Sequence, residues 1–296
     1  KANSKISYVL TILLVTAQLA LAYLLRVSLL NMQNTSWTVF LIVTYVIGGT
    51  IAHASHVLIH DFTHFAGDES PTLNRLFAIL NNVCIGVPSA IAFGKYHADH
   101  HNYLGEYMKD PDLPLVHEFK LRKPNLNNQH SLEKGNMGLL VTLVYGLRPI
   151  FFYARPTNKY EVANTVFMLI VDVLVYKLIG PAGLAYLIIC AFLSIGPHPT
   201  ALHIYTEHYE YVNKMETYDY IGPMNIVGLN IGYHIEHHDF PTVPWYNLPK
   251  LRAAAPEFYE HFPKHTSHFK MIYKFIMDDN FGLYHRIIRR NPKDVS

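Results

Sequence analysis

Residues 6–25 read ISYVLTILLVTAQLALAYLL, an apolar run of 20 residues without a charged side chain. A helix of this length rises about 30 Å, which matches the hydrocarbon core of a bilayer. Three further runs, at about 37–59, 162–178 and 184–198, are also largely apolar. The sequence therefore predicts an all-α integral membrane protein with about four transmembrane helices.

The composition agrees with a membrane protein that has substantial polar parts. Half of the 296 residues are hydrophobic and 16% are charged, whereas soluble domains carry about 25% charged residues. The net charge of +2 favours neither nucleic acid nor an acidic partner. Two cysteines without CxxC spacing argue against a disulfide framework or a thiolate zinc site. No internal repeat or linker divides the chain, so we expect one domain over residues 1–296.

The basic residues predict the orientation of the spans. If four helices cross the membrane, the two short loops on one side carry only Arg26 and Lys177 of the 24 basic residues. By the positive-inside rule the opposite side is cytosolic. Both termini and a cap made of residues 60–161 and 199–296 then face the cytosol. Two broken apolar segments, 73–93 and 138–153, are expected to be interfacial or re-entrant, because they contain Asn, Gly, Pro or Arg.

Histidine is the unusual residue of this chain, with 19 copies. Eight of them form three clusters at span ends or in polar segments: His60 and His64; His97, His100 and His101; His234, His237 and His238. The spacings i,i+3 and i,i+4 place side chains on one side of a helix, so we expect each H-x-x-H-H triplet to present three imidazoles to one point.

Eight imidazoles are too many for one tetrahedral zinc or one haem, and they suit two metal ions of five or six coordination. Imidazole binds Zn, Cu, Fe and Ni, so the pattern alone does not choose the metal. The expected reaction favours iron, because the obvious substrate beside these clusters is membrane lipid. Four acids lie beside the clusters: Asp61, Asp99, Glu236 and Asp239. They are candidates for carboxylates that hydrogen-bond to ligand rings, and ordinary surface acids are the equal alternative.

The stretch NIGYHIEHHDFP at 230–241, with Leu248-Pro249 and Met277-Asp278-Asp279, resembles the sphingolipid Δ4-desaturases (dihydroceramide desaturases) of the membrane fatty-acyl desaturase superfamily. The resemblance extends from about Tyr8 to Arg290. One departure is Asp61, where that family is expected to have Glu.

The resemblance implies a di-iron enzyme of the endoplasmic reticulum membrane that introduces the Δ4 double bond into dihydroceramide to give ceramide. It implies two Fe ions held by the eight histidines, O₂ as co-substrate, and electrons from NADH through cytochrome b5 and its reductase. A ninth ligand would come from the segment before the third cluster, where His208 matches best and His203 is the runner-up. These two lie about 140° apart on an ideal helix, so both are not expected to point at one metal.

Other interpretations stay open at this point. The same clusters fit a sphingolipid C4-hydroxylase or a bifunctional enzyme, and a histidine-rich metal or haem carrier is a third class. The chain has no GxGxxG after a strand pattern, which favours a separate electron donor. His53 and His56 are expected to pack helices or to support the site. Six further histidines are expected at the solvated surface: His117, His130, His261, His265, His268 and His285. The pattern does not identify substrate-contact residues.

Overall fold

The computed structural model describes residues 5–30, 34–113, 152–278, 281–282 and 285–289, and these are mostly helical. Three described stretches are long and apolar enough to cross a membrane: Lys5–Arg26, Trp37–Thr63 and Pro181–Glu207. The first lies in α1 (Lys5–Leu30). The second joins α2 (Asn34–Val43), the π-helical turn η1 (Thr44–Gly48) and α3 (Gly49–Thr63). The third contains α9 (Pro181–Ser194), the 3₁₀ turn η3 (Pro199–His203) and α10 (Ile204–Glu207). The chain is therefore a membrane protein.

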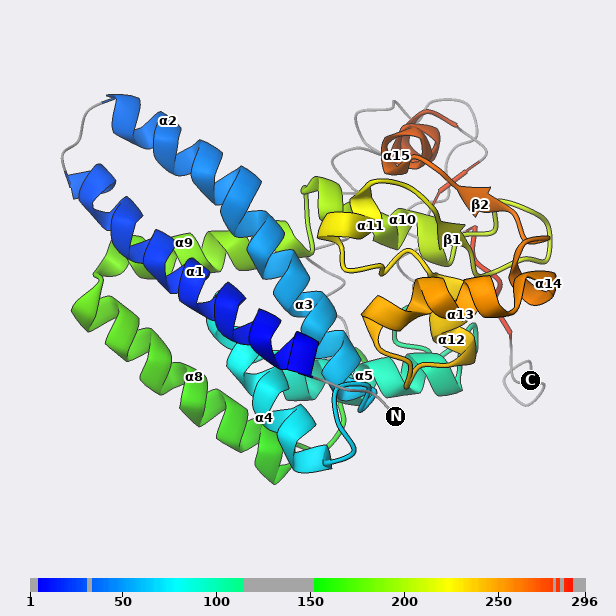
Figure 1. The fold of residues 1–296 in the computed structure, drawn as a ribbon, viewed down its shortest axis with the longest axis horizontal. Helices are drawn as coiled ribbons and strands as arrows, with labels where there is room; N and C mark the ends of the chain where they lie inside the picture. Colours follow the sequence, from blue (N-terminus) through cyan, green and yellow to red (C-terminus); the bar gives the residue numbers. More distant parts are fainter. Residues whose placement is uncertain (1–4, 31–33, 114–151, 279–280, 283–284, 290–296) are drawn as a thin grey trace.

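The expected span at 162–178 is part of a fourth long helix, α8 (Lys159–Leu178). Asn158 and Glu161 form a capping box at its start, which satisfies free N–H groups of the first turn. α8 is not among the candidate spans, and it carries four charged side chains: Lys159, Glu161, Asp172 and Lys177. It packs beside α9 and runs along the bundle (Figure 1). That α8 crosses the bilayer stays a prediction.

The apolar segment 73–93 is broken, as its Asn, Gly and Pro residues predicted. α4 (Pro71–Asn81) and η2 (Asn82–Cys84) are followed by a bend and then by α5 (Ala90–Asn102). Asn82 stabilises the bend, because its Oδ1 accepts hydrogen bonds from the backbone N–H groups of Ser89 and Ala90. Its Nδ2 donates to Asn164 of α8 at 2.6 Å. The second broken segment, 138–153, lies outside the described residues except for its last two.

The core of the helical bundle lies where α1, α3, α4 and α9 pack together. Leu58, Ile59, Tyr186 and Leu187 are fully buried there. The core also encloses Gln18, which donates to the carbonyl of Cys84 at 3.1 Å and accepts from the Tyr186 hydroxyl at 3.0 Å. A polar side chain inside an apolar bundle is tolerated when it is hydrogen-bonded in this way.

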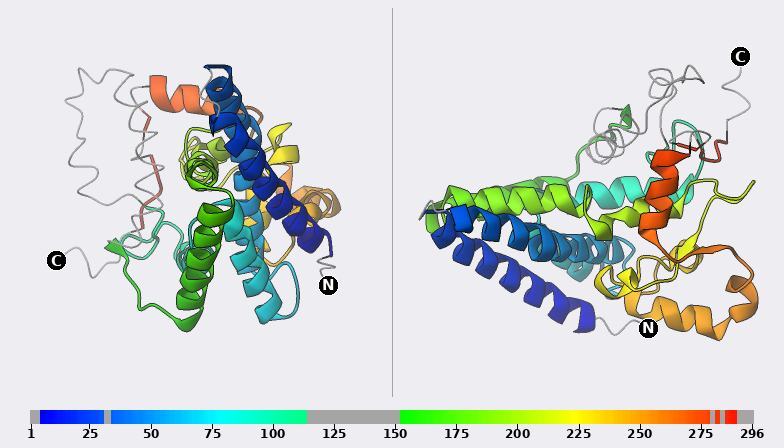
Figure 2. Two further views of the ribbon diagram at one scale, coloured as in Figure 1. Left: turned by 90° about the vertical axis from the view of Figure 1, so that its left-hand side faces the viewer. Right: turned by 90° about the horizontal axis from the view of Figure 1, so that it is seen from above.

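The remaining elements form a cap at one end of the bundle (Figures 1 and 2). They are β1 (Asp219–Tyr220), α11 (Met224–Val227), α12 (His234–Asp239), η4 (Trp245–Asn247), α13 (Leu248–Ala254), α14 (Pro256–Tyr259), β2 (Lys264–His265) and α15 (His268–Met277). The two strands pair in parallel, with Asp219 opposite Lys264. This small sheet is a departure from the all-α prediction. The cap meets the bundle where α3 and α5 end, and the histidines lie at this junction.

Candidate metal centre

Four segments bring nine histidines together where the bundle meets the cap. His60 lies in the last turn of α3 and His64 follows that helix. The second cluster occupies the end of α5 and the third occupies α12. His208 follows α10 directly. Both H-x-x-H-H patterns are helical, as the spacing predicted.

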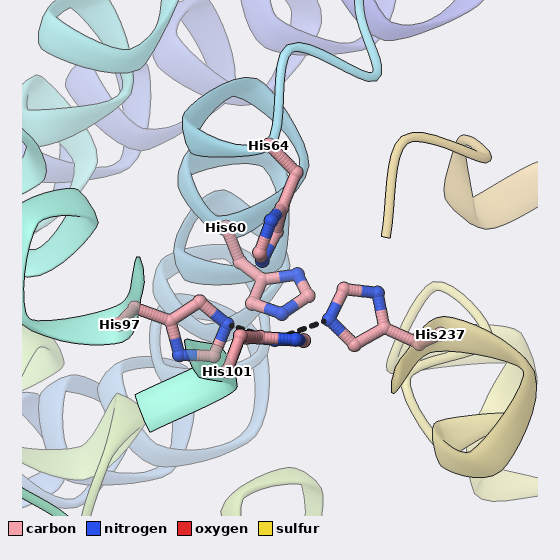
Figure 3. Close-up of side chains that lie close together, drawn as sticks. All are labelled: His60, His64, His97, His101 and His237. Atoms are coloured by element: carbon pink, nitrogen blue, oxygen red, sulfur yellow. Dashed lines mark hydrogen bonds between the residues drawn. The ribbon is translucent and has the colours of Figure 1, made fainter. Parts of the chain in front are cut away.

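Five of the histidines form one group, which we call the five-histidine group: His60, His64, His97, His101 and His237. One ring nitrogen of each lies within 4.8 Å of those of the others. The Nε2 atom of His101 is 3.1 Å from Nε2 of His97 and 3.1 Å from Nε2 of His237. Figure 3 shows the five rings turned toward a common point from three directions.

The other four form the four-histidine group: His100, His208, His234 and His238. Nε2 of His208 is 3.1 Å from Nε2 of His100 and 2.9 Å from Nε2 of His234. Nε2 of His234 is in turn 3.1 Å from Nε2 of His238. The ninth candidate, His208, therefore lies at the middle of this group.

The two triplets divide between the groups, so the expectation that each converges on one point was wrong. His97 and His101 of α5 join the five-histidine group, whereas His100 joins the other. In α12, His237 joins the five-histidine group, whereas His234 and His238 join the other. The reason is geometric: positions i and i+4 nearly align on a helix, whereas adjacent positions differ by about 100°.

Metal binding explains this convergence better than hydrogen bonding does. A neutral imidazole nitrogen has either one hydrogen or one lone pair in the ring plane. It therefore cannot form good hydrogen bonds with two other rings, yet Nε2 of His208 faces two. Two nitrogens bound at right angles, each about 2.1 Å from one ion, lie about 3.0 Å apart. In addition, Nδ1 of His60 and Nε2 of His64 are buried without a hydrogen-bond partner among the described residues. Both groups fit the donor set of a metal ion.

The rings are held in the neutral form that metals require. Burial lowers the pKa of His97, His208 and His237 well below the usual value, and neighbouring histidines lower it further. The same causes lower the pKa of His101 to about 2. Because protonation is unfavourable at these positions, their lone pairs are available near neutral pH.

His100 differs, because carboxylates support its far side. Its Nδ1 lies 2.9 Å from Oδ1 of Asp110 and 3.3 Å from Oδ2 of Asp112. Burial alone lowers the pKa of His100, but Asp112 and Asp110 outweigh burial and raise it. A carboxylate on Nδ1 fixes the tautomer in which Nε2 is free to bind a metal. Neither acid could be recognised from the sequence, since nothing in their spacing links them to a cluster about ten residues earlier.

His208 and His203 have different partners. Nδ1 of His208 is 3.2 Å from the carbonyl of Glu216, which leaves Nε2 facing the four-histidine group. Nδ1 of His203 instead bonds to the carboxylate of Glu207, and its ring packs against His53. Glu207 also approaches Nδ1 of His234, at 3.6 Å. Glu207 thus lies between His203 and the four-histidine group. It is a further supporting acid that was not recognised from the sequence.

The four acids predicted to support the rings bond to other partners. Asp61 accepts from the backbone N–H of Trp245 at 3.0 Å. Asp99 forms an ion pair with Arg155, and the charge of Asp239 helps to raise the pKa of Tyr259 after burial, the main cause. Glu236 forms an ion pair with Arg252 at 2.8 Å. These contacts anchor the histidine-bearing helices to their surroundings, whereas Asp110, Asp112 and Glu207 approach the rings.

The remaining histidines are mostly structural. Nδ1 of His53 lies 2.9 Å from the carbonyl of Ser194, and Nδ1 of His56 is 3.0 Å from the hydroxyl of the same residue. They join α3 to α9, which agrees with a role in helix packing. His268 was expected at the surface, but it is buried against the ring of Tyr220. His117 and His130 lie outside the described residues.

Comparisons with known proteins agree with this centre. The profile of the fatty acid desaturase family matches residues 35–270. A sphingolipid delta(4)-desaturase/C4-monooxygenase of Bos taurus is 38% identical over 259 residues, which cover 87% of this chain and 78% of that protein. The protein of the same name from Homo sapiens is 36% identical over 280 residues, covering 94% and 83%. A sphingolipid delta(4)-desaturase of Drosophila melanogaster is 37% identical over 265 residues, covering 89% and 81%. This chain belongs to the fatty acid desaturase family.

Proposed function

We propose that the protein is a sphingolipid Δ4-desaturase, which converts dihydroceramide to ceramide. The observation that carries the proposal is the pair of histidine groups, in which Nε2 atoms about 3 Å apart face one another. The relatives named as sphingolipid desaturases supply the substrate class, because they match this chain over most of its length.

The nine histidines are the proposed ligands of two iron ions, one in each group. Two bound irons, with O₂ as co-substrate, would supply the oxidising chemistry that an unactivated C–H bond requires. The protein's residues orient the nine rings and hold them in a buried junction, where burial keeps rings such as His97, His208 and His237 neutral. Asp110 bonds to Nδ1 of His100, while Asp112 lies 3.3 Å from the same atom and Glu207 lies 3.6 Å from Nδ1 of His234. These acids are the proposed supports of rings in the four-histidine group.

The proposed topology has four spans, with α8 as the fourth, in the membrane of the endoplasmic reticulum. The cap and both termini face the cytosol, where cytochrome b5 and its reductase would deliver electrons from NADH. The distribution of basic residues supports this orientation. A lipid tail must then reach the histidines from the membrane, and the bent segment between α4 and α5 is a candidate wall of that route. We propose an apolar tunnel there.

A second candidate reaction is C4-hydroxylation of the same lipid. The printed name of the bovine and human relatives includes C4-monooxygenase. Desaturation and hydroxylation begin with removal of a hydrogen from the same part of the chain, so a small shift of the substrate changes the product. The histidine groups do not distinguish the two reactions.

The test is to express the protein in cells that lack this activity and to measure their sphingolipids. Ceramide formed at the expense of dihydroceramide supports the desaturase, and 4-hydroxylated product indicates the second reaction. A double variant that carries both His101→Ala and His238→Ala should form neither product. Purified protein should contain about two irons per chain and no haem absorbance. Unchanged sphingolipids together with a metal-free protein would exclude the proposal.

A further inference from the structure

α15 is a helix with two apolar faces. Its inner face buries Met271 and Phe275, and Phe275 packs on Tyr205 and Tyr209. Its outer face carries Phe269, Tyr273 and Met277, which are 60%, 66% and 49% exposed. The spacing i, i+4, i+8 aligns these three side chains in one stripe. A stripe of large apolar side chains is a sign of an interaction surface.

The direction of α15 indicates what covers this stripe. Figure 1 views α15 nearly end-on, whereas α1, α2 and α8 run across the picture. In the right-hand view of Figure 2, α15 lies crosswise to α1 and α9. The helices that cross the membrane define its normal, so α15 runs roughly parallel to the bilayer plane.

The position of α15 places the stripe next to the membrane. α15 packs against η3 and α10, which form the cap end of the candidate span Pro181–Glu207. α11 also packs against η3, and its Ile226 is 80% exposed. The same span exposes Ile188 and Phe192 along its length. The span therefore exposes apolar side chains along its length, and the two elements packed against its cap end, α11 and α15, expose apolar side chains as well.

We infer that α15 lies in the headgroup region of the same bilayer, with its outer stripe buried in lipid. Aromatic residues such as Phe269 and Tyr273 suit the boundary between headgroups and acyl chains. Lys270, next to the stripe, is exposed, and a lysine at this position suits the phosphates of a membrane surface. This contact ties the segment that carries His208 to the membrane. It does not depend on the metals or on the identity of the substrate.

Site-directed spin labelling tests the inference with the full-length chain. The two native cysteines, Cys84 and Cys190, are buried and are first replaced by Ala. Single labels are then introduced by Phe269→Cys and Tyr273→Cys. The matched control is Phe258→Cys, because Phe258 is 64% exposed on α14, and α14 lies at the end of the cap far from α1 and α8 (Figure 1). Each protein is reconstituted in vesicles of phosphatidylcholine and phosphatidylserine, and its unfolding midpoint is compared with that of the unlabelled protein.

Labels at 269 and 273 should be accessible to O₂ and shielded from a water-soluble nickel chelate, at a depth of about 5–10 Å. The label at 258 should be open to the chelate. Equal chelate access at all three positions would overturn the inference. So would shielding that appears only after a soluble haem protein is added, because the stripe would then bind an electron donor.

A second measurement uses the unsubstituted protein. A lipid with a photoreactive acyl chain should crosslink to residues 268–277 and leave 256–259 unmodified. The opposite pattern, or no crosslink to α15 while α1 is labelled, would contradict membrane contact.

Discussion

Arg252 is a buried cation that holds the third histidine cluster in place. It bonds to the carboxylates of Asp219 and Glu236, and Asp219 also accepts from the backbone N–H of Ile235 at 2.9 Å. Burial and the nearby Asp219 raise the pKa of Glu236 to about 7. One guanidinium thus compensates two buried acids, one on α12 and one on β1.

We expect Arg252→Met to lower the free energy of unfolding by about 3–5 kcal/mol, because it leaves both acids without their cation. Lys250→Met on the same helix is the control, since Lys250 is exposed and donates a hydrogen bond to Asn247. Thermal unfolding and iron content are measured together. If the two variants behave alike, Arg252 does not position the cluster.

Asp110 supplies a second prediction at this scale. Its contact with Nδ1 of His100 orients a proposed ligand. Asp110→Asn should weaken metal binding by about 10–100-fold, which is the usual cost of losing such a partner. Titration of iron release with a chelator measures the change. The control is Glu106→Gln, because Glu106 is a half-buried acid of the same loop that pairs with Lys109. This variant should leave iron release unaltered. Equal release from both variants would show that Asp110 only supports the loop.

At the scale of elements, α3 and α5 approach one another closely at a glycine. A Cβ atom on Gly94 would lie 2.7 Å from Cγ2 of Thr63. Thr63 adjoins His64, and Gly94 lies one turn before His97, so this contact sets the spacing of the five-histidine group. Gly94→Ala should destabilise the protein by about 1–3 kcal/mol, since overpacking forces a helix to shift.

Thr63→Ser in the same chain removes the clashing methyl group and keeps the hydroxyl, which donates to the carbonyl of His60. The double variant should therefore recover most of the lost stability in thermal unfolding. No recovery would mean that another contact limits the approach of α5.

These elements also indicate how far the sequence could predict the site. Helical spacing correctly placed the H-x-x-H-H residues on α5 and α12, and apolar runs identified three candidate spans. Helix geometry separates His100 from His97 and His101, but which rings of α5 meet which rings of α12 was not predictable, because it depends on how the two helices face each other. Asp110, Glu207 and Arg252 were missed for the same reason: their roles follow from tertiary contacts, and neither spacing nor residue type reveals those contacts.

At the scale of the whole molecule, the orientation of the cap can be tested in sealed microsomes. Lys109 and Phe240 are exposed near the second and third clusters, and Pro181 lies at the opposite end of the bundle. A membrane-impermeant thiol reagent should label Lys109→Cys and Phe240→Cys directly, but Pro181→Cys only after the lumen is opened. The reverse order would place the cap in the lumen and exclude a cytosolic electron donor.

The exchange of histidines between α5 and α12 has a consequence for how the protein acquires its metals. Each helix contributes a pair of rings to one group and a single ring to the other. An ion bound in either group fixes both helices, and so it has already ordered rings that the second ion needs. Loading should therefore be cooperative. Native mass spectrometry during iron titration should find mainly chains with no iron or two irons, and a dominant one-iron species would show that the two groups fill independently.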